Sequence, residues 1–277
     1  MAGILYLVAT PIGNLEDITN RAVRVLGEVD LIAAEDTRNS RRLLTHFGIT
    51  KPLVSYYEHN KKLRESKLVE ELLAGKSVAV VSDAGTPALS DPGADIARAA
   101  IANGIEVVAI PGASALLAGL TVSGLDTSSF IFCGFAPRSG GERLRYLEGL
   151  RDEKRTMVFY EAPHRIAALL LAMAEVFGPE REACACRELT KLYEEKVRGS
   201  LSEIIAHFRE HEPRGEFTLI VAGAPDGEPP SISNDELLLK LSGLLERGLS
   251  RRQAAKTLAK EYGLKASDVY DVGLDID

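Results

Sequence analysis

Residues 4–14 read ILYLVATPIGN and contain both the first strand signal of the chain and its first unusual turn. The uninterrupted apolar run at residues 4–8 is typical of a strand that is buried on both faces of a parallel sheet. The turn that follows combines proline, which fixes loop geometry, with glycine, which lets backbone amides approach a ligand closely. Because parallel sheets bind ligands at the carboxyl ends of their strands, we predict a parallel α/β sheet with a ligand site after this strand.

Strand and helix patterns alternate through the first 110 residues of the chain. Further apolar runs predict strands at residues 31–34, 53–56, 78–81 and 105–110. Helical spacing of apolar residues between these runs predicts the intervening helices, one of which begins with Asp36-Thr37 as its cap. Repeated strand–helix units indicate right-handed crossovers, and we assign residues 1–112 to an N-terminal α/β domain.

The pattern changes after Pro111-Gly112. Strand and helix signals in irregular order predict a second α/β domain with a mixed sheet over residues 113–226. Within it, we expect residues 195–200 to form an edge strand that leads into a capped helix.

The last part of the chain has a different character. Prolines and a glycine at residues 225–230 predict a linker, and residues 231–277 are helical in pattern. Ala259, Gly263 and Val269 match the packing positions of a helix-turn-helix, although a plain helical hairpin fits the same short pattern equally well.

Composition places the chain among ordinary globular proteins. Its 277 residues are 45% hydrophobic and 26% charged, and the net charge of −7 argues mildly against nucleic acid as a partner. Apolar runs fall short of the ~20 residues that a membrane helix needs, and the N-terminus lacks the basic region of a signal peptide. We therefore expect a cytoplasmic protein without membrane contact.

The chain has three cysteines, Cys133, Cys184 and Cys186. Their spacing fits neither a disulfide framework nor a zinc or redox motif, so we interpret them as small buried strand residues and expect no metal.

Three glycine- and proline-containing loops follow predicted strands, at residues 10–14, 82–93 and 111–115. Small residues allow close approach of backbone to ligand, while Asp83 and Thr86 offer specific polar contacts. The sequence contains neither the G-x-G-x-x-G of dinucleotide-binding folds nor the phosphate-binding loop of nucleoside triphosphatases. The residues alone thus indicate a small-molecule site and leave the ligand open.

Five motifs carry a family resemblance. They are VATPIGNL at residues 8–15, AEDTR at 34–38, VSDAGTPALSDPG at 81–93, PGASA at 111–115 and FYEAPHR at 159–165. With them, residues 3–223 resemble the small-subunit ribosomal RNA methyltransferase I family, a branch of the tetrapyrrole-methylase (class III) methyltransferases. The resemblance implies an α/β, two-domain tetrapyrrole-methylase-like fold, with a parallel-sheet N-terminal domain, a mixed-sheet second domain and a small helical C-terminal tail.

The same resemblance implies an activity and a cofactor site. The expected activity is S-adenosylmethionine-dependent 2′-O-methylation of a cytidine in the decoding region of 16S rRNA, by a homodimer acting on the rRNA or on the small ribosomal subunit. The cofactor is expected to contact Pro11, Gly13, Asp83, Ala84, Thr86, Ser114, Ala115, Tyr160, Glu161, Arg187, Glu188, Leu189 and Thr218.

Methylation of an alcohol releases a proton, which a carboxylate or neutral imidazole can accept. The main candidates are Asp36, His59 and Glu161. Each has an alternative role: Asp36 as a helix cap, His59 as a surface histidine, and Glu161 as a partner of Arg165 or a contact to the cofactor. Further candidates are Glu35, Glu58, Lys191 and Glu194.

Two basic blocks interrupt the acidic chain and suggest RNA contact. Residues 38–67 contain eight Lys or Arg against two acidic residues, and residues 247–265 contain six against one. Basic side chains hold phosphates and aromatic rings stack on unpaired bases, so single-stranded RNA fits better than DNA. The alternative is a solvated helix face. The predicted RNA-binding residues are Arg38, Arg41, Arg42, Tyr57, Lys61, Lys62, Arg64, Arg251, Arg252 and Lys256.

Two other functions compete with RNA methylation. One is the same fold acting on a tetrapyrrole or a diphthamide precursor, against which the basic blocks argue. The other is a non-catalytic ribosome-assembly protein that binds RNA, against which the intact set of ligand loops argues.

Overall fold

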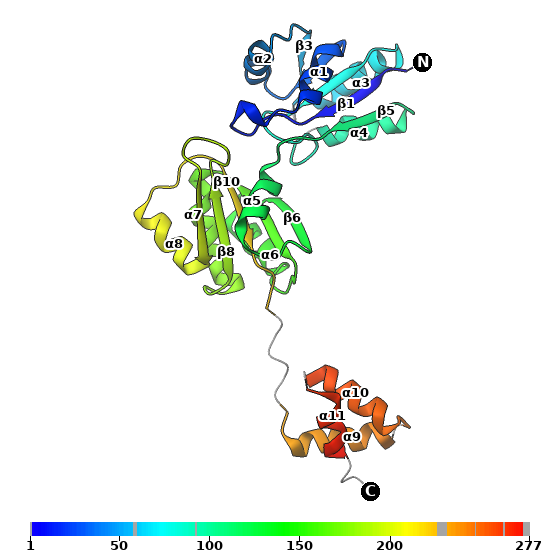
Figure 1. Ribbon diagram of the computed structural model, residues 1–277, viewed down its shortest axis with the longest axis vertical. Helices are drawn as coiled ribbons and strands as arrows, with labels where there is room; N and C mark the ends of the chain where they lie inside the picture. Colours follow the sequence, from blue (N-terminus) through cyan, green and yellow to red (C-terminus); the bar gives the residue numbers. More distant parts are fainter. Residues whose placement is uncertain are drawn as a thin grey trace. The chain divides into compact units, whose positions relative to one another are not determined.

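The computed structural model describes residues 2–57, 60–91, 93–225, 232–246, 248–262 and 264–273. The chain forms two compact units, Met1–Gly223 and Ala224–Asp277, and each is described by itself (Figure 1).

The first unit begins with a five-stranded parallel sheet, as the alternating pattern predicts. Its strand order is β3-β2-β4-β1-β5, so the chain first moves outward from β1 and then returns to place β4 beside it. The strands are β1 Ile4–Val8, β2 Leu31–Ala34, β3 Leu53–Ser55, β4 Val78–Val81 and β5 Glu106–Ile110.

Helices cover both faces of this sheet because its strands are apolar on both sides. One face packs against α1 (Asn20–Glu28) and α2 (Thr37–His46), and the other against α3 (Lys61–Leu73) and α4 (Gly93–Ala102). The short helix η1 (Leu15–Asp17) follows the first turn. Asp36 caps α2 by accepting a hydrogen bond from the Arg38 N–H, which confirms the predicted cap.

The second sheet of this unit is mixed, in the order β6-β7-β10-β8-β9. Only β6 and β7 run parallel; the other neighbours are antiparallel. The strands are β6 Phe130–Phe135, β7 Thr156–Glu161, β8 Glu182–Arg187, β9 Glu195–Ser200 and β10 Phe217–Val221. The predicted edge strand is confirmed as β9, and Ser200 at its end forms a capping box with Glu203.

Helices also cover both faces of the second sheet. Helix α5 (Ala115–Ser123) packs on one face. On the other face lie α6 (Gly140–Glu148), α7 (Pro163–Phe177) and α8 (Leu201–Glu210), which together with the sheet enclose the largest apolar core. Cys184 and Cys186 are buried in β8 and Cys133 is half-buried in β6, as expected for strand residues.

The second unit contains three helices, α9 (Asn234–Glu246), α10 (Arg251–Tyr262) and α11 (Ala266–Val272). They share a small apolar core that includes Leu241 and Leu258. Ala259 and Val269, two of the three predicted packing positions, are buried there, whereas Gly263 and the linker residues 226–231 lie outside the described residues. Among the residues that the structure describes, no helix has the length and apolarity needed to cross a membrane.

Candidate functional site

The three predicted ligand loops meet at the carboxyl ends of the parallel strands. Backbone hydrogen bonds join the first two: the Thr10 N–H donates to the Gly85 carbonyl (2.9 Å), and the Gly85 N–H donates to the Thr10 carbonyl (3.0 Å). The Thr86 hydroxyl donates to the Ala113 carbonyl (3.1 Å) and so connects the second loop to the third. Since β4 and β5 lie on either side of β1, the strand order itself brings these loops together.

The end of β2 completes this edge of the sheet with acidic side chains. Burial, and then the negative charge of Asp83, raises the pKa of Glu35, although the Asp83 N–H donates a hydrogen bond to its carboxylate. Asp36 has the opposite character, because hydrogen bonds from the exposed Arg38 lower its pKa to about 2. The Glu35 carboxylate therefore binds a proton more tightly than an ordinary glutamate, and the adjacent Asp36 carboxylate binds one less tightly than an ordinary aspartate.

Asp91 organises the distal part of the second loop. Its Oδ1 accepts hydrogen bonds from the backbone N–H groups of Ala88 (2.8 Å) and Gly93 (2.7 Å). Ala88 and Ser90 have φ angles of 72° and 68°, which L residues adopt rarely, so this carboxylate holds a strained loop. Burial raises the pKa of Asp91.

Tyr160 and Glu161, at the end of β7, contribute from the second sheet. The Leu116 N–H at the start of α5 donates to the Tyr160 hydroxyl (2.9 Å), and burial raises the pKa of Tyr160. Glu161 is 2% exposed. Its Oε1 accepts from the Ala162 N–H (2.9 Å), and its Oε2 lies 3.1 Å from Arg165 Nη2 without a hydrogen-bond partner. A buried carboxylate oxygen thus retains capacity for a donor from a ligand.

The loop between β8 and β9 forms the remaining wall. Lys191 Nζ bonds Glu188 Oε1 (2.9 Å) and Glu216 Oε2 (3.2 Å). Burial acts to raise the pKa of Glu188. Hydrogen bonds from the Lys191 ammonium and the Glu216 backbone N–H, together with the charge of Lys191, outweigh burial, so the pKa of Glu188 is lowered. A Cβ atom on Gly13 would lie 2.3 Å from Lys191 Cγ, so the first turn needs glycine beside this loop.

Residues from both sheets line one cavity of about 550 Å³. The charged side chains in its lining are predominantly acidic. They are Lys191 and the carboxylates of Glu35, Asp83, Asp91, Glu161, Glu188 and Glu216. Of the predicted cofactor residues, the cavity is lined by Asp83, Ala84, Thr86, Ser114, Ala115, Tyr160, Glu161, Glu188, Leu189 and Thr218.

Several predicted residues lie elsewhere. Pro11 and Gly13 are absent from the cavity lining, although their neighbour Ile12 contributes to it. Arg187 is turned toward Glu195, with Nε 2.5 Å from Oε2. Asp36 is engaged by Arg38 instead of lining the cavity. His59 and Glu58 lie outside the described residues.

Sequence reasoning missed other lining residues, among them Phe135 and His164. Phe135 is exposed at the end of β6 and makes an edge contact with the Tyr160 ring, at 5.8 Å between centroids. His164 belongs to the FYEAPHR motif, which could have directed attention to it. Phe135 carried no such signal, because an apolar strand residue predicts a core position.

In the first unit, the predicted RNA-binding residues whose side chains the structure describes are not among the lining residues of this cavity. Arg38, Arg41 and Arg42 are exposed on α2 and line a shallow surface hollow with Thr45 and His46. Tyr57 is 40% exposed and Arg64 is half-buried, while the side chains of Lys61 and Lys62 lie outside the described residues. In the second unit, Arg252 and Lys256 are exposed on α10 and Arg251 is half-buried.

Comparison with known proteins gives the family. Residues 4–205 match the model of the tetrapyrrole (corrin/porphyrin) methylases. The ribosomal RNA small subunit methyltransferase I of Synechocystis sp. is 48% identical over 99% of both chains. The protein of the same name from Bacillus subtilis is 45% identical over 97% of this chain and 93% of its own.

The chain belongs to the tetrapyrrole methylases, in the branch of the ribosomal RNA small subunit methyltransferases I.

Two solved structures share the fold. A diphthine synthase superposes with a TM-score of 0.62 at 15% identity, covering 80% of this chain and 90% of its own. The uroporphyrin-III C-methyltransferase of Thermus thermophilus, complexed with S-adenosylhomocysteine, has a TM-score of 0.57 at 21% identity, covering 79% and 97%. These likenesses confirm the predicted α/β fold class.

Proposed function

We propose that the chain transfers the methyl group of S-adenosylmethionine to the 2′-hydroxyl of a cytidine in the decoding region of 16S rRNA. The observation that carries this proposal is the 48% identity, over 99% of both chains, to a ribosomal RNA small subunit methyltransferase I. We further infer that it acts as a cytoplasmic homodimer on 16S rRNA or the small ribosomal subunit.

The cavity fits the cofactor in size and charge. Its volume of about 550 Å³ lies within the usual range of small-molecule sites. Six carboxylates in the lining create a negative potential that favours a sulfonium cation over an anionic ligand. Oε2 of buried Glu161, which is ion-paired with Arg165 but has no hydrogen bond, offers an acceptor for a donor group of the cofactor. We assign the ten predicted residues that line the cavity to cofactor binding.

When bound, the cofactor supplies an activated methyl group. The protein's own contribution is alignment of the two reactants and acceptance of the hydroxyl proton. Alignment can remove about 7–11 kcal/mol of a barrier in favourable cases. Among the described candidates, we favour the Glu35 carboxylate as proton acceptor over Asp36, because a carboxylate whose pKa is about 2 is a poor base.

The exposed basic surface of α2 supports RNA as the substrate. Arg41 and Arg42 project from a helix that begins at the same edge of the sheet as the cavity, directly after Glu35 and Asp36. Phosphates held by these guanidinium groups would place a nucleotide near the cavity mouth. We assign a second, independent phosphate contact to Arg252 and Lys256 of the C-terminal unit.

Transfer of labelled methyl groups tests the proposal. Small ribosomal subunits from cells lacking this enzyme are incubated with the full-length chain and tritiated S-adenosylmethionine, and the nucleosides are then separated. The expected product is 2′-O-methylcytidine at one position. Label on a base, or on a tetrapyrrole only, would overturn the substrate assignment. Failure of calorimetry to detect cofactor binding at high micromolar concentration would favour a non-catalytic RNA-binding protein.

A further inference from the structure

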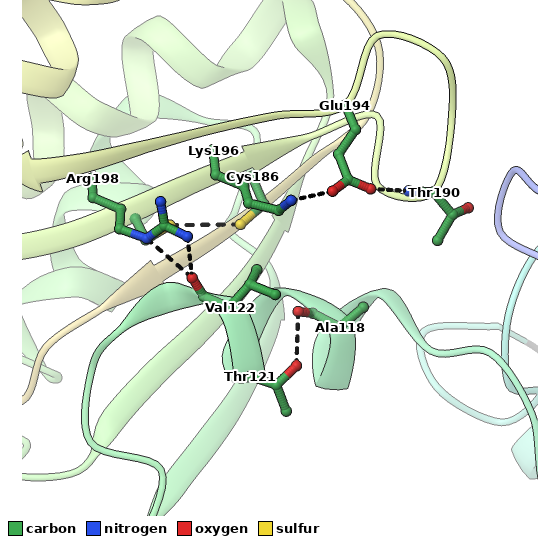
Figure 2. A network of polar contacts seen from close by, with 9 residues as sticks. Ala118, Thr121, Val122, Cys186, Thr190, Glu194, Lys196 and Arg198 are labelled. Atoms are coloured by element: carbon green, nitrogen blue, oxygen red, sulfur yellow. Dashed lines mark hydrogen bonds and ion pairs between the residues drawn. The ribbon is translucent and has the colours of Figure 1, made fainter.

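Cys184 and Cys186 form a pair of adjacent thiols in β8. Because they are two residues apart on one strand, both side chains point to the face of the sheet covered by α5. Their sulfur atoms are 3.6 Å apart, and both residues are fully buried. Figure 2 shows Cys186 near Lys196, with the contact between the two sulfurs drawn as a dashed line.

Two cations lie across from these thiols on the edge strand β9. The register pairs Cys184 with Arg198 and Cys186 with Lys196. The hydrogen bond from the Cys186 thiol lowers the pKa of Cys184, and the charges of Arg198 and Lys196 act in the same direction. The thiolate is the form of cysteine that binds thiophilic ligands, and these surroundings favour it at Cys184, beside the Cys186 thiol.

The geometry suits a ligand that bonds both sulfurs at once. A central atom could bond both sulfurs through bonds of about 2.3 Å each. With a bent angle at that atom, such bonds span the observed S···S distance of 3.6 Å. Among the described residues, no group of three or more His, Cys, Asp or Glu side chains could hold a metal ion, so two sulfurs make up the donor set. Such a set selects soft, thiophilic ligands over hard cations.

Helix α5 couples this pair to the cavity. Leu116 and Leu120 of α5 pack in the same apolar cluster as both thiols. A Cβ atom on Gly119 would lie 2.9 Å from Thr218 Cγ2, so α5 approaches β10 closely enough to require glycine at this position. At its carboxyl end, Arg198 Nε donates to the Val122 carbonyl (3.1 Å), as Figure 2 shows.

The amino end of the same helix belongs to the cavity wall. Ser114 and Ala115 line the cavity, and Thr218, the cross-strand partner of Cys186, lines it as well. An added atom between the sulfurs would press on Leu116 and Leu120, which pack in the same cluster, and close-packed interiors transmit such a displacement. The displacement would therefore reach the residues at the amino end of α5.

We propose that Cys184 and Cys186 are a dithiol site for thiophilic ligands of the trivalent arsenical class, and that its occupation opposes ligand binding in the cavity. In the reaction with phenylarsine oxide, two S–H bonds and the As–O bond are replaced by two As–S bonds. The oxygen leaves as water with both thiol protons, and arsenic stays trivalent. The first half of the proposal is independent of the proposed function, and the second half rests on S-adenosylmethionine binding in the cavity.

Intact-mass measurement with phenylarsine oxide tests the site. The reduced full-length chain, the Cys184→Ala and Cys186→Ala variants and the matched control Cys133→Ala are treated and then washed with a monothiol. Wild type and Cys133→Ala are expected to keep one phenylarsenic group, which a dithiol removes, while circular dichroism stays native. The Cys184→Ala and Cys186→Ala variants are expected to keep none. Retention by either of these variants, or none by wild type, would overturn the site.

Titration of S-adenosylhomocysteine into treated and untreated protein tests the coupling. The arsenical adduct is expected to weaken binding by about tenfold or more, a usual size for coupling between two sites. By reciprocity, saturating S-adenosylhomocysteine should weaken arsenical binding by the same factor. Equal affinity with and without the adduct would overturn the coupling. If untreated protein does not bind S-adenosylhomocysteine, the proposed function fails, whereas the mass result still decides whether the dithiol site exists.

Discussion

The backbone N–H of Asp36 donates a hydrogen bond of 2.9 Å to Oδ1 of Asp83, which joins the ends of β2 and β4. These strands are neighbours in the sheet, so the bond connects the residue that begins α2 with the polar centre of the second ligand loop. Asp83 therefore has two roles, as an anion in the cavity lining and as an acceptor that shapes its floor.

Substitutions at Asp83 separate these roles. Asp83→Ala removes both the charge and the acceptor, and we expect cofactor affinity to fall about tenfold or more, because a hydrogen bond to a charged group contributes about 1.5–3 kcal/mol. Asp83→Asn keeps an acceptor for the Asp36 N–H and should lose less. Calorimetric titration measures both, with Asp152→Ala on an exposed turn as the control. Unchanged affinity in Asp83→Ala would exclude this loop from the cofactor site.

Gly13 is predicted to tolerate no side chain. In Gly13→Val, the new Cβ meets Lys191 Cγ at 2.3 Å, so Lys191 must leave its partners Glu188 and Glu216. We expect weaker cofactor binding with a smaller effect on the thermal midpoint. The control is Gly27→Ala in α1, where a Cβ meets nothing within 4 Å and the substitution should stabilise the helix by up to about 1 kcal/mol. If Gly13→Val binds the cofactor normally, the turn and the β8–β9 loop are not coupled in the site.

Charge reversal on α2 should affect RNA and spare the cofactor. The double variant Arg41→Glu, Arg42→Glu places acidic groups in the basic hollow, away from the cavity lining. Methylation of small subunits should fall about tenfold or more and depend less steeply on salt, since each lost phosphate contact changes that slope by about 0.7–0.9. Arg209→Glu, exposed on α8, is the matched control. Parallel loss of S-adenosylhomocysteine binding would show a structural role for these arginines.

The raised pKa of Glu35 predicts how the stability of the folded protein changes with pH. Its pKa is raised in the folded protein, so the folded state holds this proton more tightly, and stability falls as pH rises from the unfolded value of 4.5 through the folded pKa. Glu35→Gln removes the titration and should therefore raise the thermal midpoint at pH 8 relative to wild type, with little difference near pH 4. Methyl transfer should decrease in the same variant if the carboxylate accepts the proton.

The opposite result would contradict this interpretation of Glu35. A loss of stability of equal size at both pH values would mean that the side chain acts through packing. Glu28→Gln, whose exposed carboxylate pairs with Arg24 on α1, provides the comparison at both pH values.

Local sequence patterns determined much of the fold. The apolar runs, the Asp36 cap and the edge strand at residues 195–200 are confirmed in the structure. Each of these features depends on backbone preferences and on which faces of a segment are apolar, and both are properties of neighbouring residues. The motifs further identified the family, which the relatives confirm.

Tertiary structure alone decided how neighbouring side chains divide their roles. Glu35 enters the cavity while Asp36 pairs with Arg38, and Arg187 turns to Glu195 while Glu188 lines the wall. Phe135 at the cavity and the contact between Cys184 and Cys186 were also outside the reach of pattern reasoning. The physical reason is that these contacts depend on strand order and on side-chain direction at strand ends, which bring together residues distant in the chain and leave no local periodicity.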